Sequence, residues 1–320
     1  MNLHEHKNEF ESAINMTAQT LNIKRHFVEK DYWICRSLQL MMRQDTERYA
    51  VFKGGTSLTK AYGIGSRFSE DIDIAILDAD TISGNKLKNL IRRTAHAMTE
   101  GLTEVVKDGV TSKGSHYHKA FYSYPVISAV PTSTVVNPGE LLLEINSFGN
   151  PYPWEMRTIR SFIAEYFYHS GNEVYVTQFD MEDFEVPVLD KCRTMTEKLA
   201  SLMRCSLADE YMPQLQAKIR HFYDLYYLLG DKDCHAYLQS DTFRQDFRTL
   251  IEHDRTCFDK PIGWQHRALS ESPLICNLHD TWHAIEPTYL RELPDLAYRT
   301  IPSSDDILSS IAELLMLIKL

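Results

Sequence analysis

The sequence lacks the long apolar run that a membrane span requires. No stretch of its 320 residues approaches the roughly 20 apolar residues that cross a bilayer. The segment 1–12 is charged and polar, without the apolar core of a secretory signal. We therefore expect a globular protein of the cytoplasm with no membrane partner.

Cysteine pairs with metal-ligand spacing are also absent. The six cysteines are scattered and none forms a Cys-x-x-Cys pair, so the sequence favours neither a zinc site nor a disulfide scaffold. The histidines are dispersed as well. His116 and His118 lie close together in a Tyr-rich segment, but no third ligand is near them in the sequence, which argues against a metal site.

An excess of positive charge is the third absence. A net charge of −10 argues against a general nucleic-acid coat, because nonspecific binding requires many lysines and arginines to neutralise phosphates. A local basic groove remains open, since several cations fall in one downstream segment: Lys191, Arg193, Lys198, Arg204, Lys218 and Arg220.

The chain is long enough, and at 43% hydrophobic residues apolar enough, to bury a substantial core. Helical periodicity over 8–44 and 86–101 alternates with strand patterns, and most of the chain after Pro187 is helical in pattern. We expect an α/β (mixed α+β) fold with a catalytic domain over 1–183 and a mainly helical domain over 184–320. The remaining expectations are strands at 51–52, 71–76 and 174–179, a helix at 56–62, and strands over 103–147 with turns near 112–115 and 137–139.

Two carboxylates one residue apart are the first chemical candidates. Strand residues alternate between faces, so Asp71 and Asp73 should share one face while Ile72, Ile74 and Ile76 enter the core. Mg²⁺ prefers oxygen ligands and usually takes one or two carboxylates together with substrate phosphates. The pair therefore predicts a site for a divalent cation.

A glycine turn precedes this strand. Gly54 and Gly55 carry no Cβ, so their backbone N–H groups can approach an anion, and Thr56 begins a predicted helix. Ser57 and Lys60 would lie near the bound phosphates. Taken alone, a glycine pair is usually an ordinary turn and an Asp-x-Asp pair is usually solvated charge. Their order, strand, Gly-Gly turn, helix and Asp-x-Asp strand, favours a shared phosphate site.

Glu144 lies in an unusually apolar strand. Leu141, Leu143 and Ile145 share one face, which leaves Glu144 on the other face with Asn146. A solvent-facing strand charge is the structural alternative to a role in the site.

Two motifs of this chain resemble those of one family: Phe52-Lys53-Gly54-Gly55-Thr56-Ser57-Leu58, and Arg67-Phe68-Ser69 followed by Asp71-Ile72-Asp73. They are similar to the AbiEii-type nucleotidyltransferase toxins of abortive-infection and type IV toxin–antitoxin systems, within the superfamily related to DNA polymerase beta. Segments 28–33, 197–204 and 218–226 resemble further motifs of that family, so the likeness extends from about residue 26 to 230.

The resemblance implies an antiviral, growth-arresting toxin that transfers a nucleotide from an NTP and releases pyrophosphate. Asp71 and Asp73 would bind Mg²⁺, with Mn²⁺ as an alternative, and Glu144 would be the third acid. The expected acceptor is the 3′ end of tRNA or another RNA, and a cognate antitoxin is the expected protein partner.

The resemblance also assigns residues of the second domain to the nucleotide. Lys198 and Arg204 would offset phosphate charge. Asp224 is the only acid of its motif, because His221 stands where the family often has one. The structural alternative for Asp224 is a helix-surface ion pair with Arg220, four residues earlier.

Two other functions remain open. The chain is alternatively a nucleotidyltransferase for a small molecule or a protein side chain, which suits its acidic charge better than RNA does. It is otherwise a catalytically weak nucleotide-binding module that acts through protein interactions, although its complete acidic set argues against that.

Overall fold

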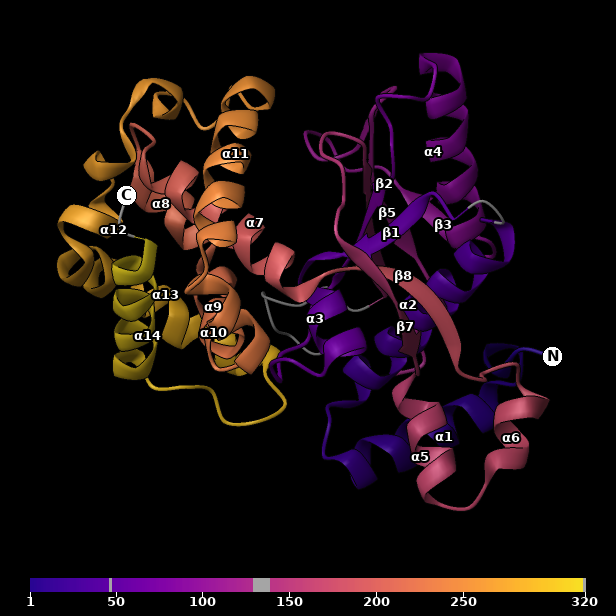
Figure 1. The fold of residues 1–320 in the computed structure, drawn as a ribbon. Coiled ribbons are helices and arrows are strands. Elements are labelled where there is room, and N and C mark those ends of the chain that lie inside the picture. Colours follow the sequence, from indigo (N-terminus) through magenta and orange to yellow (C-terminus); the bar gives the residue numbers. More distant parts are fainter. Residues whose placement is uncertain (46–47, 129–138, 319–320) are drawn as a thin grey trace. The chain divides into compact units, whose positions relative to one another are not determined.

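The computed structural model describes residues 1–45, 48–128 and 139–318 (Figure 1). These residues form two compact units. The first, the catalytic unit, comprises Met1–Gly63 and Phe68–Leu189, and the second, the helical unit, comprises Ile64–Arg67 and Asp190–Leu320. The boundary falls later than the expected 183/184 because β8 (Phe184–Leu189) pairs with strands of the catalytic sheet.

The catalytic unit is a mixed α/β structure built on one sheet, which confirms the predicted fold class. The strand order is β3-β5-β6-β2-β1-β8-β7, with β4 paired to β5. β2 is antiparallel to β1 and parallel to β6. The other strands are β1 (Ala50–Lys53), β2 (Asp71–Ile76), β3 (Thr103–Val105), β4 (Ser112–Lys113), β5 (Tyr117–Ser123), β6 (Glu140–Asn146) and β7 (Trp154–Ile159).

Strand alternation separates a buried face from an accessible one. Ile72, Ile74 and Ile76 of β2 are buried, and so are the odd-numbered residues of β6. Gly114 N–H donates to the Tyr117 carbonyl, which closes the hairpin expected near 112–115. Residues 137 and 138 of the second expected turn lie outside the described ranges.

Helices cover this sheet and gather at one end of it. α2 and α4 pack against each other, α2 contacts β6 and β8, and α4 contacts β5 and β6. The predicted helix at 8–44 is divided because Asn22 adopts a left-handed conformation and ends α1. The helices are α1 (Lys7–Leu21), α2 (Arg25–Gln44), α3 (Gly54–Tyr62), α4 (Gly84–Met98), α5 (Phe162–His169) and α6 (Glu173–Gln178), with a short 3-10 turn at Leu3–Glu5.

The strand expected at 174–179 is wrong, since this segment belongs mainly to α6. Its valines and aromatic residues are typical of strands, but within α6 only Val176 is buried. α5 packs against both α1 and α6, and Figure 1 shows these helices away from the catalytic strands. Local composition therefore predicted a strand, whereas the segment forms a short helix that buries a single side chain.

The helical unit is assembled around α7 and α9, which pack together, with α14 against α9. Its core contains Tyr223, Trp282 and Tyr289. Ser303 and Asp306 form a capping interaction at the start of α14. The helices are α7 (Lys191–Ser206), α8 (Tyr211–Ala217), α9 (Ile219–Leu229), α10 (Lys232–Leu238), α11 (Asp241–Cys257), α12 (Pro273–Cys276), α13 (Leu278–Leu296) and α14 (Ser304–Ile318), with 3-10 turns at Trp264–His266 and Leu269–Glu271. Every helix in the described ranges is too short or too polar to cross a membrane.

Candidate active site

Asp71 and Asp73 lie on the accessible face of β2. Both are partly exposed, whereas Ile72 between them is buried, so the predicted shared face is confirmed. The strand starts at Asp71 itself. Both carboxylates therefore lie near the first residue of β2, the end of the strand that the chain enters after α3.

A row of four charged residues crosses the sheet through Asp73. Glu144 of β6 is opposite Asp73 in the parallel pair. Lys119 of β5 is opposite Glu144 on one side of the row, and Lys53 of β1 is opposite Asp73 on the other. Facing residues of neighbouring strands project to the same side of a sheet, and like charges placed opposite each other repel. The two central acids therefore favour a cation beside them.

Glu144 is held by two residues of β5. Lys119 Nζ forms an ion pair with Glu144 Oε1, and Tyr117 Oη donates to Glu144 Oε2 at 3.2 Å. Burial and the nearby carboxylates of Glu144 and Asp73 raise the pKa of Tyr117, which keeps its phenol protonated. Sequence reasoning missed both partners. The alternation of β5, which places Tyr117 and Lys119 on one face, was the available signal.

Gly54 lies directly against Asp73. Its φ is +82°, and a Cβ at this position would collide with the Asp73 carboxylate. Gly54 is also the first residue of α3, whose N-terminus has no side-chain cap within the described residues. The first N–H groups of a helix have no intrahelical partners, so this end of α3 can donate to an anion beside Asp73.

Thr56 and Ser57 secure the turn through their hydroxyls. Thr56 Oγ1 donates to the Asp71 carbonyl at 2.5 Å, and Ser57 Oγ donates to the Gly54 carbonyl at 2.9 Å. Both side chains are buried. The Thr56 bond fixes the first turn of α3 to the start of β2, and the Ser57 bond holds the turn that contains Gly54 and Gly55.

Lys60 lies inside the catalytic unit instead of on its surface. Its Nζ is 2.6 Å from Asp31 Oδ1 of α2, and the two side chains are only 8% and 1% exposed. It also donates to the Arg160 carbonyl at 2.6 Å and lies over the Phe162 ring. Burial opposes the charge, but the Asp31 carboxylate raises the pKa of Lys60 above its usual range. These contacts favour a role in holding α3 over direct contact with phosphate.

Asp224 is the centre of a buried ionic cluster in the helical unit. Arg67 Nε and Nη2 each donate to one of its oxygens at 2.7 Å, and Lys198 Nζ is 2.8 Å from Oδ2. Burial alone would raise the pKa of Asp224, but Arg67 and Lys198 hold it well below its usual range. The alternative of a surface ion pair with Arg220 is therefore wrong, because Asp224 is buried and its described partners are Arg67 and Lys198.

Arg204 occupies a separate position in the helical unit. Its Nη1 is 2.7 Å from Asp254 Oδ2 of α11. Its guanidinium also lies 4.3 Å from the centre of the Phe258 ring and 5.9 Å from that of Trp264. Stacking and ion pairing orient this side chain, and Arg is suited to such planar contacts.

The donor set at the carboxylates fits a hard divalent cation. No group of three His, Cys, Asp or Glu side chains within the described ranges is arranged to hold a metal unaided. Mg²⁺ commonly takes only one or two protein carboxylates and completes its shell with water and phosphate oxygens. Asp71 and Asp73 match that pattern. His118, by contrast, bonds to Tyr122 Oη at 3.0 Å, as expected of a structural histidine.

Comparison with known proteins agrees with this architecture. The family model of the AbiEii nucleotidyl transferase toxin of type IV toxin–antitoxin systems matches residues 37–310. The structure is similar to that of MenT4, a nucleotidyltransferase toxin from Mycobacterium tuberculosis, with a TM-score of 0.51, 14% identity, and coverage of 96% of this chain and 99% of that one. A search of curated protein sequences gives no match. The chain belongs to the AbiEii family of nucleotidyl transferase toxins, and its activity class is therefore nucleotidyltransferase.

Proposed function

We propose that this protein transfers a nucleotide from an NTP to a hydroxyl of an RNA acceptor in a Mg²⁺-dependent reaction. The observation that carries the proposal is the packing of Gly54 against Asp73, with Glu144 directly opposite Asp73 in the next strand. In this proposal a helix end for phosphate, a carboxylate for the metal and a third acid act together at one end of β2.

Asp71 and Asp73 would hold the cation, with Mn²⁺ as a substitute for Mg²⁺. When bound, the cation would neutralise charge on the triphosphate and on the departing pyrophosphate. The uncapped N–H groups of Gly54, Gly55 and Thr56 would donate to phosphate oxygens, while the side chains of Thr56 and Ser57 keep the turn in place.

The reaction is a displacement at the α-phosphorus. The acceptor hydroxyl oxygen forms a bond to phosphorus, the bond from phosphorus to the oxygen bridging to the β-phosphate breaks, and pyrophosphate departs with that electron pair. Glu144 would take the hydroxyl proton, and Lys119 and Tyr117 would orient its carboxylate. No covalent intermediate on the protein is required, because positioning and charge supply the rate.

The helical unit would contribute phosphate contacts and close the nucleotide site. We assign Lys198 and Arg204 to the nucleotide, with Asp224 as the residue that holds Lys198. The assignment of Lys198 rests on its place in the family motif, and in the structure the Arg67–Asp224–Lys198 cluster holds its ammonium in position. Lys60 acts in this proposal through the position of α3.

The biological role follows from the family. We propose a toxin that arrests growth from within the cytoplasm by modifying RNA, with the 3′ end of tRNA as the acceptor, and that is restrained by a cognate antitoxin. A small molecule or a protein side chain is the alternative acceptor, and the net charge of −10 is the observation that favours it. A module that only binds nucleotides would have no need of the opposed pair Asp73 and Glu144.

The decisive experiment is incubation of purified protein with total tRNA, Mg²⁺ and each labelled NTP in turn. The wild type should label RNA, and Asp73→Asn or Glu144→Gln should reduce labelling by about a hundred- to a thousandfold, the loss expected for a group acting in the transition state. Glu140→Gln is the matched control, because it removes a carboxylate from the same face of the same strand. If the wild type labels no RNA, small molecules and protein side chains become the acceptors to test. Full activity in Asp73→Asn would reject the metal assignment.

A further inference from the structure

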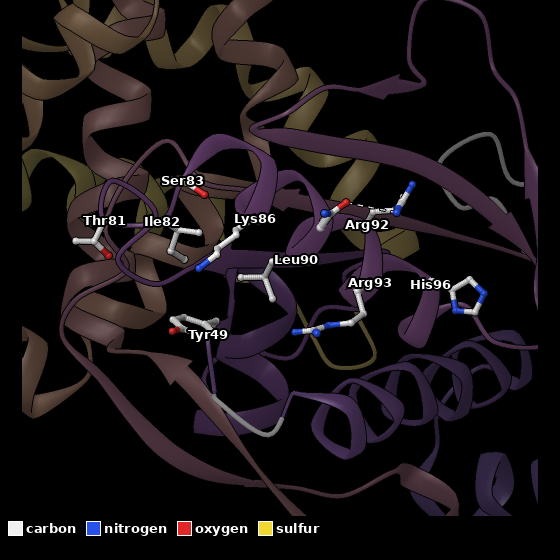
Figure 2. A pocket seen from close by; sticks show the side chains of 10 residues that line it. Tyr49, Thr81, Ile82, Ser83, Lys86, Leu90, Arg92, Arg93 and His96 are labelled. Atoms are coloured by element: carbon white, nitrogen blue, oxygen red, sulfur yellow. Dashed lines mark hydrogen bonds between the residues drawn. The ribbon is translucent and has the colours of Figure 1, made fainter.

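The catalytic unit carries a hollow at the end of β1 and β2 opposite the carboxylates. It has a volume of about 1030 Å³ and lies between α4, the turn that follows β2, and Tyr49. In Figure 2, Lys86, Leu90 and Arg93 of α4 and the ring of Tyr49 are turned toward one common space. Arg92 and His96 continue the basic lining along the helix.

This hollow concentrates positive charge in an acidic protein. None of the described residues that line it is an acid. Among the described residues, Lys86, Arg93 and His96 have no ion-pair partner, and Arg92 bonds only to Asn89, at 3.4 Å. Several exposed cations elsewhere in the unit have carboxylate partners, as Lys113 has Glu104 and Arg160 has Asp183. Leaving several cations together without partners favours an anionic ligand.

Tyr49 adds an aromatic surface to the charge. One part of its side chain packs against the buried cluster of Val51, Leu77 and Leu189, which fixes the ring at the margin of the hollow. Leu90, buried in α4, provides apolar surface nearby. A fixed aromatic ring flanked by cations is the arrangement with which proteins bind single-stranded nucleic acid, the ring stacking on a base and the cations contacting phosphates.

The hollow lies at the opposite end of β1 and β2 from the active site. Tyr49 precedes β1 and Gly54 follows it, and the turn after β2 returns to the Tyr49 end. At about 3.3 Å per strand residue, Tyr49 and Gly54 are roughly 17 Å apart. A mononucleotide or small-molecule acceptor cannot contact both places, whereas an RNA can.

We propose that this hollow is an RNA-binding exosite, in which Lys86 and Arg93 contact phosphates of the acceptor and Tyr49 stacks on one of its bases. The inference rests on the proposed RNA acceptor and adds a site that the transfer reaction itself does not require. Its ligand is a single-stranded or unpaired segment of the acceptor, held while the reacting end lies at Asp73.

The test compares Lys86→Ala/Arg93→Ala with wild type for binding of labelled tRNA to the full chain, by fluorescence anisotropy at several salt concentrations without divalent cation. Each phosphate contact on a single strand contributes about 0.7 to the slope of log affinity against log salt. The double variant should therefore lose about 1.4 in slope and bind about tenfold more weakly near 0.15 M salt. Lys7→Ala/Lys88→Ala removes the same charge from exposed positions of the same unit outside the hollow, and it should keep the wild-type slope.

Tyr49 tests the stacking component. Tyr49→Phe retains a ring and should bind tRNA like wild type, whereas Tyr49→Leu retains apolar packing and should bind about five- to a hundredfold more weakly. In the transfer assay, the charge variant should raise the KM for tRNA about tenfold while kcat stays within about twofold.

The outcomes separate the two proposals. If wild type labels no RNA, the RNA acceptor and the exosite are both rejected. If wild type labels RNA but the variants bind tRNA with unaltered affinity and slope, only the exosite is rejected, and the cations become candidates for an acidic protein partner. Equal losses in the control pair, or full competition by free NTP for the hollow, would also overturn the exosite.

Discussion

Gly54 and Asp73 are in such close contact that no side chain fits at position 54. The glycine has a φ of +82°, and the space where its Cβ would be is taken by the Asp73 carboxylate. Glycine is therefore required here for two reasons: it adopts the backbone conformation of the turn, and it lets α3 approach the carboxylate of Asp73 on β2. This contact joins the two motifs into one site.

Replacement of Gly54 by alanine should disable the enzyme more than it destabilises the fold. Gly54→Ala must displace the Asp73 carboxylate, and misplacement by about 1 Å costs roughly a hundredfold in rate. Gly63→Ala is the matched control, because Gly63 also has positive φ, +64°, but among the described residues no atom apart from those of its chain neighbours lies within 4 Å of its Cβ position. Both variants should lose about 1–2 kcal/mol of stability in urea unfolding. Equal activities of the two variants would contradict the contact's catalytic importance.

Divalent cations should stabilise the protein through Asp71 and Asp73. A ligand that binds only the folded state at 100 times its Kd contributes about 2.7 kcal/mol, so Mg²⁺ or Mn²⁺ should raise the thermal midpoint. Asp71→Asn and Asp73→Asn should lose this shift. Asp80→Asn, an exposed acid beyond the other end of β2, should keep it. A shift that survives in Asp73→Asn would place the cation elsewhere.

Breaking the Lys60–Asp31 pair should cost stability. Lys60→Met leaves the buried Asp31 carboxylate without its cation, a change that costs about 3–5 kcal/mol. The double variant Asp31→Leu/Lys60→Met removes both charges and should recover part of that loss, as urea titrations would measure. If the unfolding free energy of Lys60→Met is within about 1 kcal/mol of the wild-type value, and not lower by about 3 kcal/mol or more, the pair contributes little to stability.

The Asp224 cluster predicts a specific dependence on pH. Because the pKa of Asp224 is lower folded than unfolded, its ionised form stabilises the protein fully above the usual value of 3.8, and this contribution is lost as pH falls through the folded pKa. The stability difference between wild type and Asp224→Asn should therefore be constant from pH 7 to about 5 and shrink below about pH 4. Urea unfolding at pH 3 to 7 tests this, and a difference independent of pH would contradict it.

Strand alternation predicted the carboxylate face correctly because it depends only on local geometry. Asp71, Asp73 and Glu144 follow a period of two within their own strands, and the apolar residues between them are buried as expected. Register was beyond sequence reasoning. That Glu144 faces Asp73, and not Asp71, depends on the parallel pairing of β2 and β6 across a long segment.

Roles that depend on distant partners were harder to predict. Lys60 follows the glycine turn in sequence, but its partner Asp31 comes from α2, so the pattern gave no sign of its burial. Asp224 similarly pairs with Arg67, a residue of the motif that precedes β2. Ion pairs within one helix can be inferred from spacing, whereas these pairs are created by tertiary structure.

The short segment Ile64–Arg67 belongs to the helical unit, although the sequence places it between α3 and β2. The chain consequently passes between the units after residues 63, 67 and 189. A single break after residue 189 would not yield two independent parts, because Arg67 would remain bound to Asp224. Nor could one recombination event exchange residues 190–320 for those of a relative without placing foreign helices against Arg67 of this chain. The two units of this toxin should therefore be inherited as one.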